Sequence, residues 1–336
     1  MSRIFTSGKI GALELKNRII MPPMCMFSAG DDGKPVKFHE IHYGARALAG
    51  VGLIIVEATS VHPKGGLSVK DLGLWSDEQI EAHKNIVDVC HAFGSHIAVQ
   101  INHAGRKGYE ESASASGIPY LEGDKTPARL SIEQIEEIKD AFVNAAKRAK
   151  RAGYDAVELH AAHGFLLSEF LSPIANKRDD KYGGSLQNRS RFVLDTAKKI
   201  KDEAKITLIV RISAEEWVEG GWSLADSVYL AKELEKAGAD AVHVSSGGLS
   251  NVQPLMPPLV PLYQSAYAKE IKKHLNIPLI AVGIITKASE AEALLLGDVC
   301  DFVAIGRELL SNPNFCLYAA KAFKEKVIPQ YERGNF

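Results

Sequence analysis

The chain has 336 residues, of which 46% are hydrophobic and 24% charged, as is typical of a folded globular protein and not of a disordered or fibrous one. Its 40 lysines and arginines nearly balance 41 aspartates and glutamates, so the net charge is −1. This balance argues against nucleic acid or an anionic membrane surface as partner. No apolar run approaches the roughly 20 residues of a membrane span, so we expect no membrane association.

The four cysteines are far apart in the sequence and form no C-x-x-C pair. This spacing argues against a metal or iron–sulfur cluster built on a local cysteine motif, and it suits a reducing compartment. The N-terminal residues lack the apolar core of a secretory signal. We therefore expect a cytoplasmic protein with free thiols at Cys25, Cys90, Cys300 and Cys316.

Short, continuously apolar segments recur along the chain, each preceded by a helix end and a turn residue. Residues 151–160 are echoed by residues 236–245, with Gly153 and Gly238 where a helix commonly ends in a left-handed residue. Apolar runs without alternation predict parallel strands that are buried on both faces. We expect eight strands, near residues 18–24, 52–58, 96–101, 156–160, 207–213, 241–245, 278–283 and 302–306.

Amphipathic helical stretches separate most of these strands. Residues 131–152 form one of them, opening with a capping box of Ser131 and Gln134, and residues 188–203 form another. Eight strands alternating with helices favour a single-domain (β/α)8 TIM barrel over residues 1–336. An open doubly wound sheet is the alternative, but no G-x-G-x-x-G motif follows the first strand.

Two segments are longer than an ordinary connection between a strand and a helix. Residues 108–130 are rich in serine, glycine and glutamate, and residues 247–262 contain four prolines. Both follow predicted strands, so both are expected on the C-terminal face of the barrel, where long loops commonly form lids or walls of a site. Surface insertions without function are the alternative.

Glycines and an arginine follow the last two predicted strands. Gly283 ends the seventh strand, and Gly306 and Arg307 end the eighth. In barrels of this kind, backbone N–H groups at this place commonly bind a phosphate, and an arginine adds positive charge. The alternative is that these glycines only allow tight turns.

Two histidines, His160 and His163, lie at the end of the fourth predicted strand. They could be zinc ligands, but the other strand ends do not supply the further histidines and carboxylates that such a site needs. The pair is better explained as hydrogen-bond donors to a carbonyl or phenolate oxygen, and a structural role stays open.

Arg211 and Gln100 lie on predicted strands and suggest what the barrel binds. A buried guanidinium needs an anionic neighbour, and an amide carries a donor and an acceptor suited to the edge of a heterocycle. Together with a phosphate site and paired histidines, these residues indicate a phosphorylated heterocycle facing a polar substrate. Flavin mononucleotide (FMN) satisfies each of these requirements.

The motifs of this chain, taken in order, resemble those of the Old Yellow Enzyme family of FMN-dependent, NADPH-consuming ene-reductases, and most closely its short, thermophilic-like class. The resemblance runs over nearly the whole chain, and the order and spacing of the motifs make it specific. The motifs are Leu15-Lys-Asn-Arg-Ile19, Pro23-Met-Cys-Met26, His103-Ala-Gly-Arg106, His160-Ala-Ala-His-Gly164, Glu169-Phe-Leu-Ser-Pro173, Asp180-Lys-Tyr-Gly-Gly-Ser185, Ile305-Gly-Arg-Glu308 and Gln330-Tyr-Glu-Arg333.

The resemblance implies roles for individual residues. His160 and His163 are expected to bind the oxygen of an α,β-unsaturated carbonyl compound, and Cys25 to tune the flavin. Arg333, in a C-terminal tail of about residues 325–336, is expected to enter the site of a neighbouring subunit in a homo-oligomer, either a dimer or a tetramer. The reductant is NADPH or NADH. The expected FMN-binding residues are Pro23, Met24, Cys25, Ala58, Gln100, Arg211, Gly283, Gly306 and Arg307.

Two positions depart from the family pattern. Relatives usually carry tyrosine where this chain has Phe27 and Phe165, both expected to border the substrate. The tyrosine hydroxyl at the second position is the expected proton donor to the substrate α-carbon, and phenylalanine cannot donate a proton. We hypothesise that water, Tyr109 or Tyr120 supplies the proton, or that the natural acceptor is a quinone or nitro compound that needs little acid help.

Three other functions stay open on the sequence. An enoyl or dienoyl thioester reductase is one, although its larger relatives add a four-cysteine cluster and a nucleotide-binding domain that cannot be fitted to this sequence. A flavin-free barrel lyase or isomerase acting on a sugar phosphate is the second, although no lysine for a Schiff base is found at a strand end. A flavin-binding protein without turnover is the third.

Overall fold

The computed structural model describes residues 2–109, 113–327 and 331–334. Within these residues, eight parallel strands form a closed barrel, because β3 pairs with both β13 and β4. The prediction of a single (β/α)8 barrel is confirmed, and the predicted strands differ from the observed ones only at their ends. The barrel strands are β3 (Ile19–Met21), β4 (Leu53–Ser60), β6 (His96–Asn102), β9 (Ala156–Ala161), β10 (Thr207–Ser213), β11 (Ala241–Ser245), β12 (Leu279–Ala281) and β13 (Phe302–Ala304).

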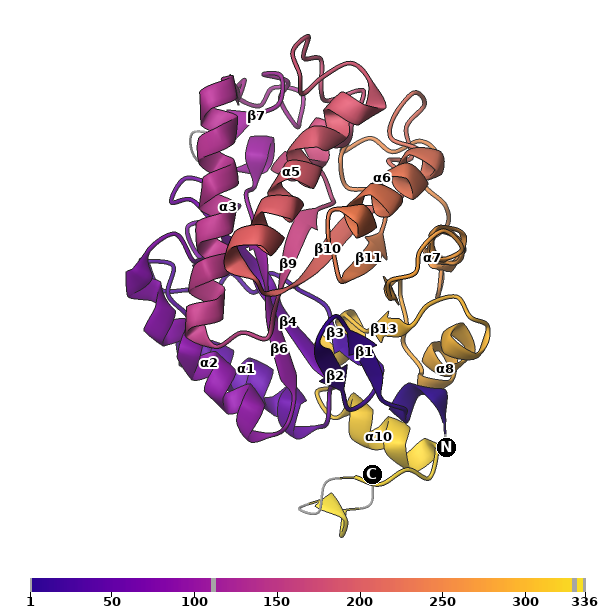
Figure 1. Ribbon diagram of the computed structural model, residues 1–336. Coiled ribbons are helices and arrows are strands. Elements are labelled where there is room, and N and C mark those ends of the chain that lie inside the picture. The colour runs from indigo at the N-terminus through magenta and orange to yellow at the C-terminus, as the bar shows by residue number, and fades with distance from the viewer. Residues whose placement is uncertain (1, 110–112, 328–330, 335–336) are drawn as a thin grey trace.

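Helices surround the barrel and cover its outer surface (Figure 1). The short helices α4 (Leu166–Leu171) and α9 (Arg307–Ser311) directly follow β9 and β13 at the end of the barrel where the strands terminate. The outer layer consists of α1 (Lys37–Leu48), α2 (Ile80–Ala92), α3 (Ile132–Ala152), α5 (Leu186–Ala204), α6 (Leu224–Lys236), α7 (Ser265–Lys272), α8 (Ala288–Leu296) and α10 (Phe315–Ala322).

The ends of helix α3 show why the sequence signals were reliable. The Ser131 hydroxyl accepts a hydrogen bond from the Gln134 backbone N–H, and the Gln134 side chain accepts one from the Ser131 N–H, so the capping box is formed. At the other end, Gly153 has φ +95°, a backbone conformation that glycine adopts without strain. Both interactions are local, so they could be read from the sequence.

The barrel interior is apolar near the start of the strands and polar near their ends. Alternate residues of a strand point inward, so Ala156 belongs to the apolar layer while Glu158 and His160 continue the same face toward the C-terminal end. The antiparallel hairpin of β1 (Gly8–Ile10) and β2 (Leu13–Leu15) packs Ile10 and Leu15 onto this apolar layer and closes the N-terminal end. The polar side chains inside the barrel therefore lie toward its C-terminal end.

Three short strands of two residues each were not predicted from the sequence, and only two of them lie in a long segment. Strands β7 (Ala113–Ser114) and β8 (Ala128–Arg129) form a small parallel pair within residues 108–130. Strand β5 (Leu72–Gly73) adds to the edge of β4. None of the helices in the described residues is both long enough and apolar enough to cross a membrane.

Candidate active site

A cavity of about 230 Å³ lies at the C-terminal end of the barrel, between the ends of β3, β10, β11, β12 and β13. It brings together residues that are far apart in the sequence but were predicted to bind one cofactor. The predicted residues that line it are Pro23, Met24, Arg211, Gly283, Gly306 and Arg307.

One end of the cavity has the properties of an anion site. Gly283 has φ +135°, which side-chain-bearing residues rarely adopt, so this backbone conformation requires glycine. Gly306 directly precedes α9, and the exposed side chain of Arg307 brings a positive charge to the same wall. This end fits the phosphate of a nucleotide cofactor.

His160 and His163 lie next to each other above the interior. Their ring centroids are 5.2 Å apart, and the rings are nearly perpendicular. Burial, and then the positive charge of Arg211, lowers the pKa of both imidazoles well below the ordinary value, so both are neutral at pH 7. The Ala162 N–H donates to His160 Nδ1 at 3.3 Å, which leaves the ring proton on Nε2. His160 can therefore donate one hydrogen bond through Nε2.

The second imidazole has a partner on another strand. His163 Nε2 lies 2.7 Å from the hydroxyl of Ser245, which also lines the cavity. The His163 backbone N–H donates to Ser213 Oγ at 2.9 Å. When the Ser245 hydroxyl donates to Nε2, the proton of the neutral ring is on Nδ1. Ser245 then leaves His163 with one N–H for a ligand.

Below the histidines, a charged and polar group fills the barrel interior. Gln100 Nε2 donates to Glu158 Oε2 at 2.7 Å, and His243 Nδ1 lies 2.7 Å from Glu158 Oε1. Arg211 is paired in strand register with His160 on one side and His243 on the other. Its Nε is buried and has no hydrogen-bond partner among the described residues. An anionic ligand in the cavity would complete this arrangement.

Cys25 lies in the loop after β3, at the edge of the same site. Burial, and then the negative charges of Asp71 and Glu57, raises its pKa to about 12, so the group is a neutral thiol. Glu57 fixes this loop, because it accepts hydrogen bonds from the Met26 N–H at 2.7 Å and from the Tyr43 hydroxyl at 3.0 Å. Near a flavin, such a thiol could donate a weak hydrogen bond.

A second cavity, of about 550 Å³, opens beside the histidines and is lined by Phe165, Lys107, Tyr109 and Tyr120. The ring of Phe165 lies 4.7 Å from that of His160. Lys107 Nζ donates to the carbonyl oxygens of His163 and Gly248 and lies 4.2 Å from the Tyr120 ring centroid. Burial lowers the pKa of Lys107 to about 8. Both tyrosines that we considered as proton donors therefore border this cavity.

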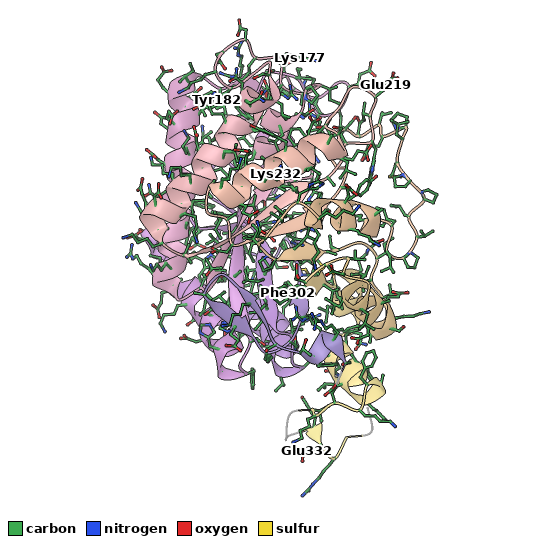
Figure 2. The ribbon with its side chains drawn as sticks, turned by 45° about the vertical axis from the view of Figure 1, so that its right-hand side comes forward. Lys177, Tyr182, Glu219, Lys232, Phe302 and Glu332 are labelled. Carbon is green, nitrogen blue, oxygen red and sulfur yellow. The ribbon has the colours of Figure 1, made fainter. Side chains whose placement is uncertain are left out.

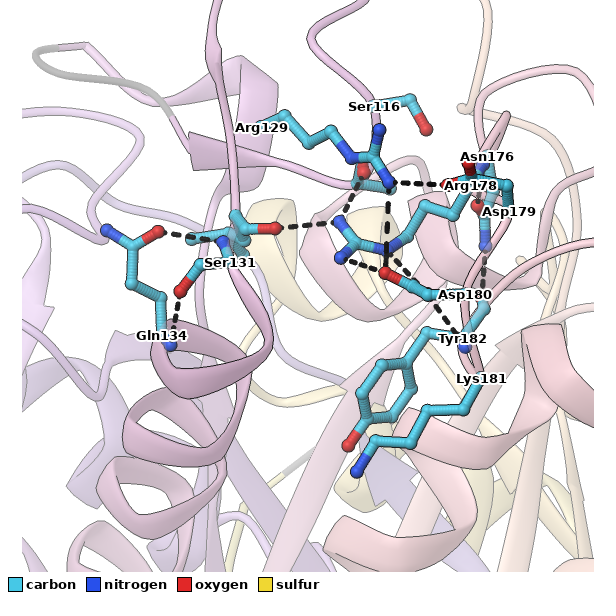
Figure 3. Close-up of polar contacts among 12 residues, drawn as sticks. Ser116, Arg129, Ser131, Gln134, Asn176, Arg178, Asp179, Asp180, Lys181 and Tyr182 are labelled. Carbon is cyan, nitrogen blue, oxygen red and sulfur yellow. Dashed lines mark hydrogen bonds and ion pairs between the residues drawn. The ribbon is translucent and has the colours of Figure 1, made fainter.

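The wall that carries Tyr120 is anchored by a buried arginine (Figure 3). Arg178 Nη1 donates to the carbonyl oxygens of Ala115 and Leu130 at 2.8 Å, and Nη2 donates to the Asp180 carboxylate at 2.6 Å. Asp180 also accepts a hydrogen bond from the Tyr182 N–H at 3.0 Å. These contacts join residues 108–130 to the segment between α4 and α5.

The donors and charges of the site fit FMN. Three features match the anionic and heterocyclic parts of that cofactor: a buried guanidinium with an unpartnered Nε on β10, an amide on β6, and a glycine end for a phosphate. Among the described residues, no three His, Cys, Asp or Glu side chains gather as they would around a metal ion. The fold and the site define a flavin-dependent oxidoreductase barrel.

Comparison with known proteins identifies the family. The model of the NADH:flavin oxidoreductase / NADH oxidase family matches residues 3–326. NADPH dehydrogenases of Listeria innocua serovar 6a and Bacillus velezensis are each 43% identical to this chain, and each alignment covers 99% of both proteins. The chain belongs to this family, and its resemblance to the Old Yellow Enzymes is confirmed. It is an FMN-dependent oxidoreductase that uses NAD(P)H as reductant.

Solved structures show the same architecture. Morphinone reductase is 29% identical, with a TM-score of 0.82 over 97% of this chain and 91% of its own. A structure titled TcOYE with pHBA is 28% identical, with a TM-score of 0.83. A 2-naphthoyl-CoA reductase is 25% identical, with a TM-score of 0.88, and this chain spans about half of it (52%).

Three predicted cofactor residues, Cys25, Ala58 and Gln100, do not line the cofactor cavity. Ala58 is buried on β4 and its backbone contacts the Cys25 thiol, and Gln100 belongs to the polar group below the histidines. Phe27 is 46% exposed, on the loop after β3. Arg333 is exposed in the C-terminal tail, of which residues 328–330 and 335–336 lie outside the described part.

Four residues that support the site were missed as site residues. Glu57, Glu158 and Ser245 each bond to a predicted site residue or to the backbone beside one, and His243 acts through Glu158. The two-residue periodicity of a strand could have identified Glu158, because it shares the inward face of β9 with His160.

Proposed function

We propose that this enzyme reduces α,β-unsaturated carbonyl compounds, with the carbonyl oxygen bound by His160 and His163. The observation that carries this proposal is the pair of neutral imidazoles at the edge of the cofactor cavity, one of which has a fixed Nε2 proton. Two donors directed at one oxygen stabilise the negative charge that develops there when a nucleophile attacks the conjugated β-carbon.

The remaining residues would bind and orient FMN and exclude water from the substrate. Arg307 and the glycine end of the cavity would hold the phosphate of FMN, and Gln100 and Arg211 would hold its ring. When bound, FMN accepts hydride from NAD(P)H and delivers it to an electron-poor carbon. Phe165 packs 4.7 Å from His160 and shields the substrate side from water.

A quinone or nitro compound is a second candidate acceptor, which Phe165 favours. These compounds need little help from an enzyme acid, and phenylalanine at this position has no proton to donate. The thioester-reductase alternative has support only from fold similarity to a protein of about twice this length. The flavin-free alternative is wrong, because the family is flavin-dependent.

Anaerobic titration distinguishes these acceptors. The purified protein should be yellow and should release FMN on denaturation. NADPH and NADH are each added until the flavin bleaches, and then 2-cyclohexenone, a quinone and a nitroarene are added separately. Recolouring by the enone supports the proposal. Recolouring by the quinone or nitroarene alone contradicts it and supports the second candidate.

Restoring tyrosine at Phe165 should raise turnover of 2-cyclohexenone by roughly tenfold or more, because a hydroxyl is added where the substrate α-carbon is expected. Turnover of the Phe165→Tyr variant is measured in H2O and D2O, so that conditions with rate-limiting protonation can be chosen. Phe93→Tyr is the matched control, since it adds the same hydroxyl at an exposed position after α2, before the start of β6 and away from the C-terminal end of the barrel. An unchanged rate for Phe165→Tyr under those conditions would refute the missing-acid explanation.

We also propose a homo-oligomer in which Arg333 enters a neighbouring active site. Figure 2 places Glu332 on a tail at one end of the molecule, and Lys177 and Glu219 on loops at the opposite end. Those loops follow β9–α4 and β10, on the side of the active site, so the tail that carries Glu332 lies at the end of the molecule opposite to the active site of its own chain. Light scattering should give a dimer or tetramer, and Arg333→Ala should raise KM for the enone. A monomer with full activity contradicts this proposal.

A further inference from the structure

Glu158 is a buried acid beside the expected flavin site, and the mechanism above gives it no role. Its relative exposure is 0%, and so is that of its neighbour His243. Burying a carboxylate away from water costs free energy unless other groups compensate. Its neighbours here are Gln100, His243 and the guanidinium of Arg211.

The hydrogen bonds around Glu158 fix the orientation of Gln100. A carboxylate oxygen only accepts hydrogen bonds, so the Nε2 end of the Gln100 amide must face it, as the 2.7 Å contact shows. Rotating the amide by 180° would bring its oxygen against the carboxylate oxygen. This contact fixes the positions of the Gln100 carbonyl oxygen and of its second N–H, which are the two groups that remain to bind a ligand.

The charge of Glu158 also acts on Arg211. Among nearby charges, Glu158 is the main one that raises the Arg211 pKa, against the lowering effect of burial. No ion pair within 4.0 Å joins the two side chains in the described residues. Glu158 therefore offsets the positive charge of Arg211 but does not occupy the Arg211 Nε, which has no hydrogen-bond partner. Burial lowers the pKa of His243, so this imidazole is neutral and adds no positive charge beside Arg211.

We propose that Glu158 is a positioning residue that lowers the reduction potential of the bound FMN, by offsetting the charge of Arg211 and by holding the Gln100 amide in one orientation. Reduced flavin carries more negative charge than oxidised flavin, so a less positive site binds the reduced form less tightly. This inference rests on the proposed placement of Gln100 and Arg211 against FMN.

Glu158→Gln tests the proposal, because it removes the charge and keeps the shape of the side chain. The midpoint potential of the holoenzyme is measured by reduction alongside a reference dye. Binding of reduced FMN should strengthen relative to oxidised FMN by roughly tenfold, which is a positive shift of about 30 mV for a two-electron couple. An unchanged or more negative potential overturns the proposal.

Glu169→Gln is the matched control. Glu169 is also a buried glutamate, but its carboxylate accepts hydrogen bonds from the Arg106 and Ala115 backbone N–H groups, in a different part of the structure. The potential should stay at the wild-type value in this variant. An equal shift in both variants would show a general effect of lost buried charge and would overturn the specific role of Glu158.

If Glu158→Gln does not fold, Glu158→Asp replaces it. Aspartate keeps the charge, but its carboxylate lies one methylene further from Gln100, so FMN should dissociate more readily. The affinity for reduced FMN relative to oxidised FMN should change by less than tenfold, so the potential should shift less than in Glu158→Gln. Wild-type values of both quantities overturn the proposal. Wild-type protein that binds no FMN would refute the placement of the cofactor itself, which is a different result from bound FMN with an unmoved potential.

Discussion

Replacing His160 by alanine is expected to lower kcat/KM for 2-cyclohexenone by about 100-fold or more, because the substrate oxygen loses a preorganised donor. His160 is suited to this role because the Ala162 N–H fixes its tautomer and because burial keeps it neutral. The measurement is anaerobic steady-state turnover, normalised to bound FMN so that cofactor loss does not count as lost catalysis.

Two further variants serve as comparisons for His160→Ala. His274→Ala removes a histidine that is 40% exposed and distant from the strand ends, and it should leave kcat/KM unchanged. Ser245→Ala keeps both imidazoles but removes the partner of His163 Nε2, so its loss should be smaller than that of His160→Ala. Full activity of His160→Ala with an enone would show that this imidazole does not bind the substrate oxygen.

Replacing Arg178 by methionine is expected to lower the free energy of unfolding by about 2–3 kcal/mol, because a buried guanidinium that donates to two backbone carbonyls and to a partly exposed carboxylate is removed. The Asp180 carboxylate and the carbonyl oxygens of Ala115 and Leu130 lose their donors together. The measurement is urea unfolding of the holoenzyme at one fixed FMN concentration, since ligand binding also contributes to stability.

Arg129→Ala is the control for the arginine variant. Arg129 makes an ion pair with Asp179 at 3.0 Å and lies 3.8 Å from the Asp180 carboxylate. Its side chain is exposed, so the expected loss is below about 1 kcal/mol. Equal losses in Arg178→Met and Arg129→Ala would contradict the anchoring role that Figure 3 illustrates.

Much of the fold could be predicted because its signals are local. Continuous apolar runs gave the strands, Ser131 and Gln134 gave a helix start, and Gly153 gave a helix end. The two-residue strands β5, β7 and β8 were not predicted, because such short segments have no periodicity to detect. Their pairing depends on neighbours that are distant in the sequence.

Residues that lie in or beside the cavities could be predicted where they stand in motifs at strand ends, and residues that act through a partner could not. Cys25, Gln100 and His163 stand in recognisable motifs, whereas the supporting Glu57 and His243 carry no motif of their own. Their importance follows from contacts, such as the hydrogen bond from Met26 N–H to Glu57 and the approach of His243 to Glu158.

The succession of apolar strands determined the class of fold, the isolated cysteines excluded a local cysteine cluster motif, and the order and spacing of the motifs pointed to the family. Only the tertiary structure decided the hydrogen-bond partners inside the barrel. His163 meets Ser245 across 82 positions of sequence, and Glu158 meets His243 across 85. Closure of eight strands into one barrel creates these contacts, because the stagger of the strands determines which inward-pointing residues lie in the same layer.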